Sequence, residues 1–110
     1  MDDTERGIEK KVYGLKDAHL QTIITYIKRC PKVEHAALFG SRAMGTYRPA
    51  SDIDIALFGD GVTAGLAAAL KFNIEEETGI PYFCDFVAYP KITNKALKDH
   101  IDRYGVTIIA

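Results

Sequence analysis

The stretch from Leu38 to Phe58, LFGSRAMGTYRPASDIDIALF, decides the fold and the chemistry expected of this chain. It joins a glycine–serine pair at the end of one apolar run to two aspartates at the start of the next. Side chains alternate between the faces of a strand, so Asp52 and Asp54 share a face, with Cα atoms about 6.5 Å apart. Carboxylates this close repel unless a cation neutralises them, and their oxygens are ligands that Mg²⁺ prefers. The aspartate pair therefore predicts a metal site.

The Gly40-Ser41 pair predicts the other half of the same site. Residues 35–39 are expected to form a strand, and residues 41–44 the first turn of a helix. A glycine between them lets the backbone approach a ligand closely, and N–H groups at a helix start bind anions. A phosphate is therefore expected beside the Ser41 hydroxyl. A phosphate next to carboxylate-held metals is the layout for phosphoryl or nucleotidyl transfer, in which two metals about 3.5–4 Å apart contact the attacking and leaving oxygens.

The spacing of this motif resembles the active-site signature of the DNA polymerase beta nucleotidyltransferase superfamily. The glycine–serine pair is followed by nine residues and then by Ser51-Asp52-Ile53-Asp54. Within the superfamily the chain is similar to the minimal nucleotidyltransferases that are paired with a helical HEPN protein, and the similarity runs from Tyr13 to Val106. The family carries a third catalytic carboxylate on a later strand among apolar residues. Asp85, within the sequence FCDFV, matches that description.

The resemblance implies a set of site residues and their ligands. Asp52, Asp54 and Asp85 would be the catalytic and metal-binding residues, with Mg²⁺, two ions, as cofactor and ATP as substrate. The nucleotide and its phosphates would be bound by Gly40, Ser41, Arg42, Arg48 and Ser51.

Simpler roles stay open for several of these residues. Asp85 could make a structural hydrogen bond, because buried polar groups are commonly paired. Ser41 could cap the short helix, and Arg42 and Arg48 could be surface cations. His19, His35 and His100 are interpreted as structural or surface residues.

Composition and length indicate one ordinary globular domain over residues 1–110. Hydrophobic residues make up 47%, charged residues 26%, and the net charge is −1, which argues against nucleic-acid binding. No apolar stretch approaches the ~18 residues of a membrane helix, and the charged start is unlike a signal peptide. We therefore expect a cytoplasmic protein that does not bind membranes, with Cys30 and Cys84 as free thiols.

Hydrophobic periodicity predicts an α+β fold. Residues 1–12 are polar and charged and are expected to be frayed at their start. Helices are expected over residues 16–30, 63–78 and 92–103, with Gly79 capping the second of them. Strands are expected over residues 35–39, 53–58 and 82–88, and residues 106–109 are expected to form a last strand or a tail. With the short helix after Gly40, this order predicts a mixed β-sheet of about four strands packed with three to four helices, and the resemblance implies the compact nucleotidyltransferase core.

The expected activity is Mg²⁺-dependent transfer of AMP from ATP to a hydroxyl. The resemblance implies that the acceptor is a tyrosine of a HEPN-type toxin, which gives this chain an antitoxin role. Two alternatives stay open. One is transfer to a small molecule such as an aminoglycoside, with a homodimer forming the acceptor pocket. The other is a non-catalytic antitoxin that masks its partner by binding within a hetero-oligomer.

Overall fold

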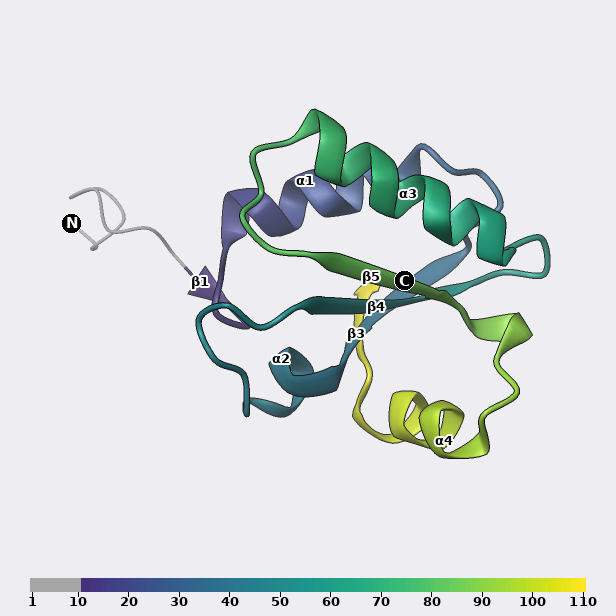
Figure 1. Ribbon diagram of the computed structural model, residues 1–110. Helices are drawn as coiled ribbons and strands as arrows, with labels where there is room; N and C mark the ends of the chain where they lie inside the picture. The colour runs from purple at the N-terminus through teal and green to yellow at the C-terminus, as the bar shows by residue number, and fades with distance from the viewer. Residues whose placement is uncertain (1–10) are drawn as a thin grey trace, which may run out of the picture.

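A computed structural model describes residues 11–110 of the chain (Figure 1). In chain order its elements are β1 (Lys11–Val12), β2 (Leu15–Lys16), α1 (Asp17–Lys28), β3 (His35–Phe39), α2 (Gly40–Met44), β4 (Ile53–Phe58), α3 (Ala64–Glu77), β5 (Cys84–Ala88), the 3-10 helix η2 (Tyr89–Lys91), α4 (Lys95–Tyr104) and β6 (Val106–Ile109). All the helices and strands expected from the sequence are present, and their ends differ by a few residues.

The main sheet has four strands in the order β5-β4-β3-β6. Strand β3 is antiparallel to both β4 and β6, whereas β4 and β5 are parallel and are connected through α3. The sheet is therefore mixed, and the predicted α+β class with a mixed sheet of about four strands is confirmed.

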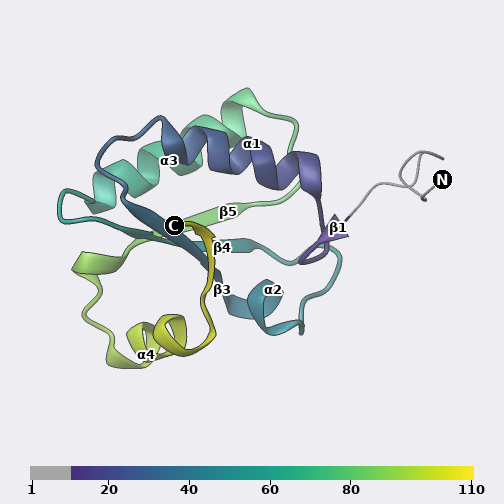
Figure 2. The ribbon, with the colours of Figure 1, turned by 180° about the vertical axis from the view of Figure 1, so that it is seen from behind.

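Helices cover both faces of this sheet. Helices α1 and α3 lie on one face, and α2 and α4 lie on the other, as the two opposite views show (Figures 1 and 2). The face under α1 and α3 holds the larger apolar core, to which β4 contributes Ile53, Ile55 and Leu57, each 0% exposed. The face under α4 holds a smaller cluster around Phe39 and Ala56. The alternation along β4 therefore places Ile53, Ile55 and Leu57 on one face and Asp54 on the other.

Local sequence explains where the helices begin and end. Leu20, Ile23 and Ile27 recur at helical spacing along α1 and are buried. The Thr63 hydroxyl accepts the Leu66 N–H at 3.1 Å and caps the start of α3. The predicted Gly79 cap is wrong, because α3 ends at Glu77 into extended backbone and Gly79 does not have the positive φ of such a cap.

A short hairpin before α1 was not predicted from the sequence. The frayed start expected for residues 1–12 falls on residues 1–10, outside the described part of the chain, whereas Lys11 and Val12 pair with Lys16 and Leu15 in an antiparallel hairpin. Its turn needs two residues with positive φ, Tyr13 at 56° and Gly14 at 76°, and such turns match the twist of a tight hairpin. Polar composition alone hid this hairpin, which buries Leu15 completely.

Two further expectations concern the whole chain. Cys30 and Cys84 are both free thiols, as predicted. Among the described residues, none of the helices has the length and apolar character needed to cross a bilayer.

Candidate active site

The sheet brings two of the predicted carboxylates side by side. Asp54 on β4 is the direct neighbour of Asp85 on the parallel strand β5, and lies opposite Phe39 on β3. Residues paired in this way project from the same face of a sheet, here the face under α4. Asp52 precedes Asp54 by two residues, so it shares this face, and it is exposed. The structure therefore gathers the three predicted aspartates at one end of β4 and β5.

Electrostatics around Asp54 are unfavourable for a carboxylate without a cation. Burial is the main cause that raises the pKa of Asp54 to about 6, and the negative charges of Asp85 and Asp52 add to it. The interaction with His100 lowers the pKa of Asp54. A cation bound here would relieve the repulsion between these carboxylates.

The donor set fits a hard divalent cation. All three side chains offer carboxylate oxygens, which Mg²⁺ prefers, and Asp54 would be the central ligand with Asp52 and Asp85 beside it. Within residues 11–110, however, no three His, Cys, Asp or Glu side chains converge into a metal-binding group. The ammonium group of Lys71 lies 3.2 Å from Asp85 Oδ1. This contact uses one oxygen, so Asp85 would offer its other oxygen, Oδ2, to a metal.

The Gly40-Ser41 turn lies directly against Asp54. Gly40 has a φ of 74°, and a Cβ added to it would collide with Oδ2 of Asp54. Its N–H donates to Nε2 of His100 at 3.1 Å. Ser41 lies at the second position of α2, whose N-cap is Phe39 without a capping side chain, so the hydroxyl is not a helix cap. Glycine at position 40 thus allows the turn to contact the carboxylate site.

His100 is a site residue that sequence reasoning missed. It lies on α4, sixty residues from Gly40 along the chain, and its ring packs edge-on against Phe39 at 6.0 Å between centroids. Nothing in the local sequence distinguishes it from an exposed helical histidine. Only the packing of α4 on this face of the sheet brings it to the Gly40-Ser41 turn.

Arg42 is placed differently from what was predicted. Its side chain is 1% exposed, and its guanidinium donates to the backbone carbonyls of Tyr13, Pro49 and Ser51 at 2.8–3.3 Å. The guanidinium also packs over the Tyr82 ring, 4.8 Å from its centroid. Arg42 therefore holds the loop before Asp52, and the phosphate contact predicted for it would require these bonds to break.

The remaining predicted phosphate ligands belong to the same loop. The Ser51 hydroxyl accepts the backbone N–H of Arg48 at 2.7 Å, and the Ser51 N–H donates to the Arg48 carbonyl at 3.0 Å. These bonds close a tight turn that leads into Asp52. The Arg48 side chain lies on the surface of this turn, where it can reach a ligand more readily than Arg42 can.

Lys71 is a second site residue that the sequence did not reveal. Its ammonium group donates to Asp85 Oδ1 and to the Cys84 carbonyl, both at 3.2 Å, and lies 2.8 Å from Glu75 Oε2. It reaches the end of β5 from α3, the helix on the opposite face of the sheet (Figure 1). The pairing of α3 with β5 is tertiary, so no local signal indicates it.

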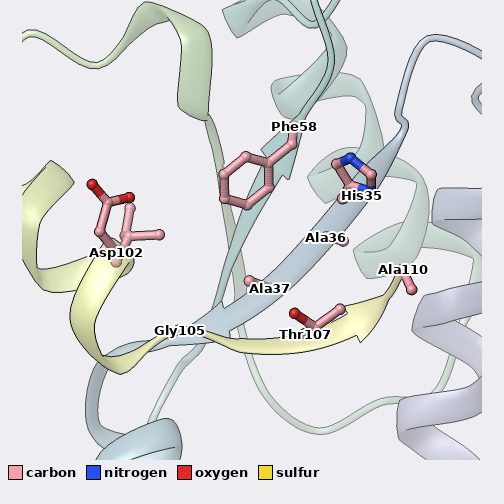
Figure 3. Close-up of a pocket in the computed structure, with 9 residues that line it drawn as sticks. His35, Ala36, Ala37, Phe58, Asp102, Gly105, Thr107 and Ala110 are labelled. Carbon is pink, nitrogen blue, oxygen red and sulfur yellow. The ribbon is translucent and has the colours of Figure 1, made fainter.

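A separate cavity of about 460 Å³ lies on the same face of the sheet, between β3, β4, β6 and the end of α4 (Figure 3). Its wall includes His35 and Phe58, which are paired at the opposite end of β3 and β4 from Phe39 and Asp54. This cavity is therefore distinct from the carboxylate site.

The carboxylates and the glycine turn agree with what comparison with known proteins finds. A family model described as polymerase beta, nucleotidyltransferase matches residues 21–110. The chain belongs to this family. The match includes all three aspartates and the glycine–serine turn. No curated protein matches the chain significantly.

Several solved structures contain a chain with a similar fold. A toxin–antitoxin crystal structure with AMP-PNP matches with a TM-score of 0.68 and 23% identity, over 80% of this chain and 70% of that chain. A mutant of the toxin–antitoxin MntA-HpeT matches with a TM-score of 0.66 and 20% identity, over 80% of this chain and 70% of that chain. The toxin–antitoxin MntA-HepT matches with a TM-score of 0.57 and 20% identity, over 84% of this chain and 70% of that chain. At these identities the likeness concerns the fold.

Proposed function

We propose that this chain is a Mg²⁺-dependent nucleotidyltransferase that moves AMP from ATP to a tyrosine hydroxyl of a HEPN-type partner, and so acts as an antitoxin. The observation that carries the proposal is the pairing of Asp54 with Asp85 across parallel strands, directly against the Gly40 turn. The family model supports the class of reaction.

Each group of the site has a role in this reaction. Asp52, Asp54 and Asp85 would hold the metal ions, which neutralise charge on the phosphates and the leaving group when bound. Gly40 and Ser41 would bind the phosphates through the turn. The acceptor oxygen attacks the α-phosphorus of ATP, and the bond from that phosphorus to the oxygen bridging it to the β-phosphorus breaks, releasing pyrophosphate. Asp85 takes the proton of the acceptor hydroxyl. Its carboxylate lies on β5, the edge strand of the sheet, where an acceptor can approach it.

A protein acceptor is supported by the fold comparison. Each of the similar structures described above is a toxin–antitoxin, and one of them contains AMP-PNP, a nucleotide. The proposal extends this setting to the present chain, with residues 1–110 as a single minimal nucleotidyltransferase domain and a HEPN protein as partner. Cytoplasmic residence is part of the proposal, and the free thiols of Cys30 and Cys84 fit a reducing compartment.

The test is mass spectrometry of a co-expressed HEPN partner after incubation with this chain, ATP and Mg²⁺. We expect mass gains of whole AMP units on a partner tyrosine, and none with Asp54→Asn. An exposed aspartate away from the site, Asp60→Asn, is the matched control and should leave transfer unchanged.

Two outcomes would contradict the proposal. Neutralisation of the partner in cells by an Asp52→Asn/Asp54→Asn double variant would show masking by contact alone. Absence of transfer to the partner, combined with adenylylation of an aminoglycoside by a homodimer of this chain, would show a small-molecule enzyme.

A further inference from the structure

An exposed phenylalanine lies immediately beside the proposed base. Phe83 precedes β5, and its side chain is 64% exposed. It is two residues from Asp85 along an extended segment, so both side chains project toward the same face of the sheet. Strand β5 is the edge of the sheet, which leaves this pair open to an incoming molecule.

Lys71 connects the aromatic ring with the carboxylate. Its ammonium nitrogen lies 5.5 Å from the centroid of the Phe83 ring and 3.2 Å from Asp85 Oδ1. The contact uses one oxygen of the Asp85 carboxylate, so the other oxygen, Oδ2, can face an acceptor. Glu75 holds the ammonium group from the other side at 2.8 Å. Asp85 is thereby oriented while its side chain stays 47% exposed.

A hollow next to Phe83 has the size and lining for an aromatic side chain. It has a volume of about 300 Å³, and it is lined by Glu75, Ile80, Pro81, Tyr82 and Phe83. Most of its walls are apolar or aromatic, and Glu75 provides a hydrogen-bond acceptor. An aromatic ring packs on such walls with favourable edge and face contacts.

We propose that Phe83, this hollow and the Lys71–Asp85 pair form an acceptor subsite for the phenol of a partner tyrosine. This inference rests on the proposed function, which it deepens by naming the residues that select the acceptor. The tyrosine ring packs against Phe83, and its hydroxyl lies at Asp85 Oδ2. Lys71 is a positioning residue, because it fixes Asp85 through Oδ1. A serine or threonine hydroxyl has no ring to pack on Phe83, so the subsite favours a phenol.

The first test separates acceptor binding from nucleotide binding. Phe83→Ala should raise the KM for the HEPN partner at least tenfold, while the Kd for ATP with Mg²⁺ stays within twofold of wild type. Phe72→Ala is the matched control, because Phe72 is 63% exposed and lies on α3. We expect it to leave both constants unchanged.

The second test concerns the positioning role of Lys71. Lys71→Met should lower kcat about tenfold with little change in the KM for the partner, and Lys71→Arg should restore most of the activity. A purely structural role would instead change the thermal stability of both variants without this rescue.

The outcomes distinguish this inference from the proposed function. Transfer by wild type that Phe83→Ala does not impair would overturn the subsite and leave the proposed function standing. Equal increases in KM for Phe83→Ala and Phe72→Ala would indicate a general contact surface and would also overturn it. Absence of AMP transfer by the wild-type chain would overturn both.

Discussion

The two faces of the sheet differ in what they contribute to this protein. Under α1 and α3, Leu38, Ile55 and Leu57 are all 0% exposed and pack into the larger core. Under α4, the neighbouring strands β4 and β5 present Asp54 and Asp85, which repel each other, beside a smaller apolar cluster. One face therefore supplies most of the stability, and this lets the other hold charges that destabilise the fold. Four predictions test this division.

The largest expected effect is a loss of stability from the α1/α3 face. Leu57→Ala removes a fully buried side chain and should lower the free energy of unfolding by about 2–5 kcal/mol. Val87→Ala, on the α4 face of β5, is the comparison, because Val87 is only partly buried. It should cost about 1 kcal/mol. Urea denaturation of both variants measures the difference, and equal losses would contradict the division.

The second prediction compares two glycines that share a backbone conformation. Gly40 and Gly45 have φ values of 74° and 80°, so alanine is strained at both positions by about 1–2 kcal/mol. Only at Gly40 does the added Cβ meet another group, the Asp54 carboxylate, whereas nothing lies within 4 Å at Gly45. Gly40→Ala should therefore lower nucleotidyl transfer about a hundredfold, and Gly45→Ala less than fivefold. Equal losses in the two variants would show that backbone strain alone is responsible.

The third prediction concerns the charge of Asp54. Its pKa is raised from 3.8 to about 6 in the folded state, so between these values the folded chain binds more protons than the unfolded chain. The contribution of Asp54 to stability therefore falls as the pH rises through this window and is unfavourable above it. Asp54→Asn removes the charge and should raise the free energy of unfolding at pH 8 by about 1–2 kcal/mol, after discounting for partial exposure.

Chemical denaturation at pH 5 and pH 8 checks this sign. The difference between Asp54→Asn and wild type should be larger at pH 8. Added Mg²⁺ should stabilise the wild type and so reduce the difference in free energy of unfolding between the two proteins at pH 8. A variant less stable than wild type at pH 8 would show that Asp54 makes a net favourable contribution as a carboxylate.

The smallest effect is expected at the contact between α4 and the glycine turn. His100→Ala removes the acceptor of the Gly40 N–H and should lower the free energy of unfolding by about 1 kcal/mol. His35→Ala is the matched control on the same face, because within residues 11–110 the His35 ring makes only an edge-on contact with Phe58. Its loss should be about half as large. Thermal unfolding of both variants measures the difference, and a larger loss for His35→Ala would contradict the role given to His100.

Sequence patterns predicted the parts of this structure that depend on near neighbours. Alternation along residues 53–58 placed Asp54 opposite the core, and helical spacing identified α1 through Leu20, Ile23 and Ile27. The β1–β2 hairpin was missed because its turn uses a tyrosine with positive φ, which few sequences signal.

Tertiary contacts account for the rest of what the sequence did not predict. His100 meets Gly40 across sixty residues, and Lys71 reaches Asp85 from a helix on the other face of the sheet. Arg42 follows the glycine–serine pair, where a cation suggests phosphate binding, yet packing against Tyr82 turns it inward. Such placements depend on how helices dock on the sheet, and periodicity within one element carries no information about docking.

The buried guanidinium of Arg42 links the β1–β2 hairpin to the loop that carries Ser51, so that the two segments are expected to move together. One side chain joins carbonyls of Tyr13, Pro49 and Ser51, so neither segment can detach without breaking bonds to the other. Fluctuations that open the hairpin should therefore also displace the residues leading into Asp52. Amide hydrogen exchange would register the coupling as a common opening rate for segments more than thirty residues apart in the sequence, such as Leu15 and Asp52.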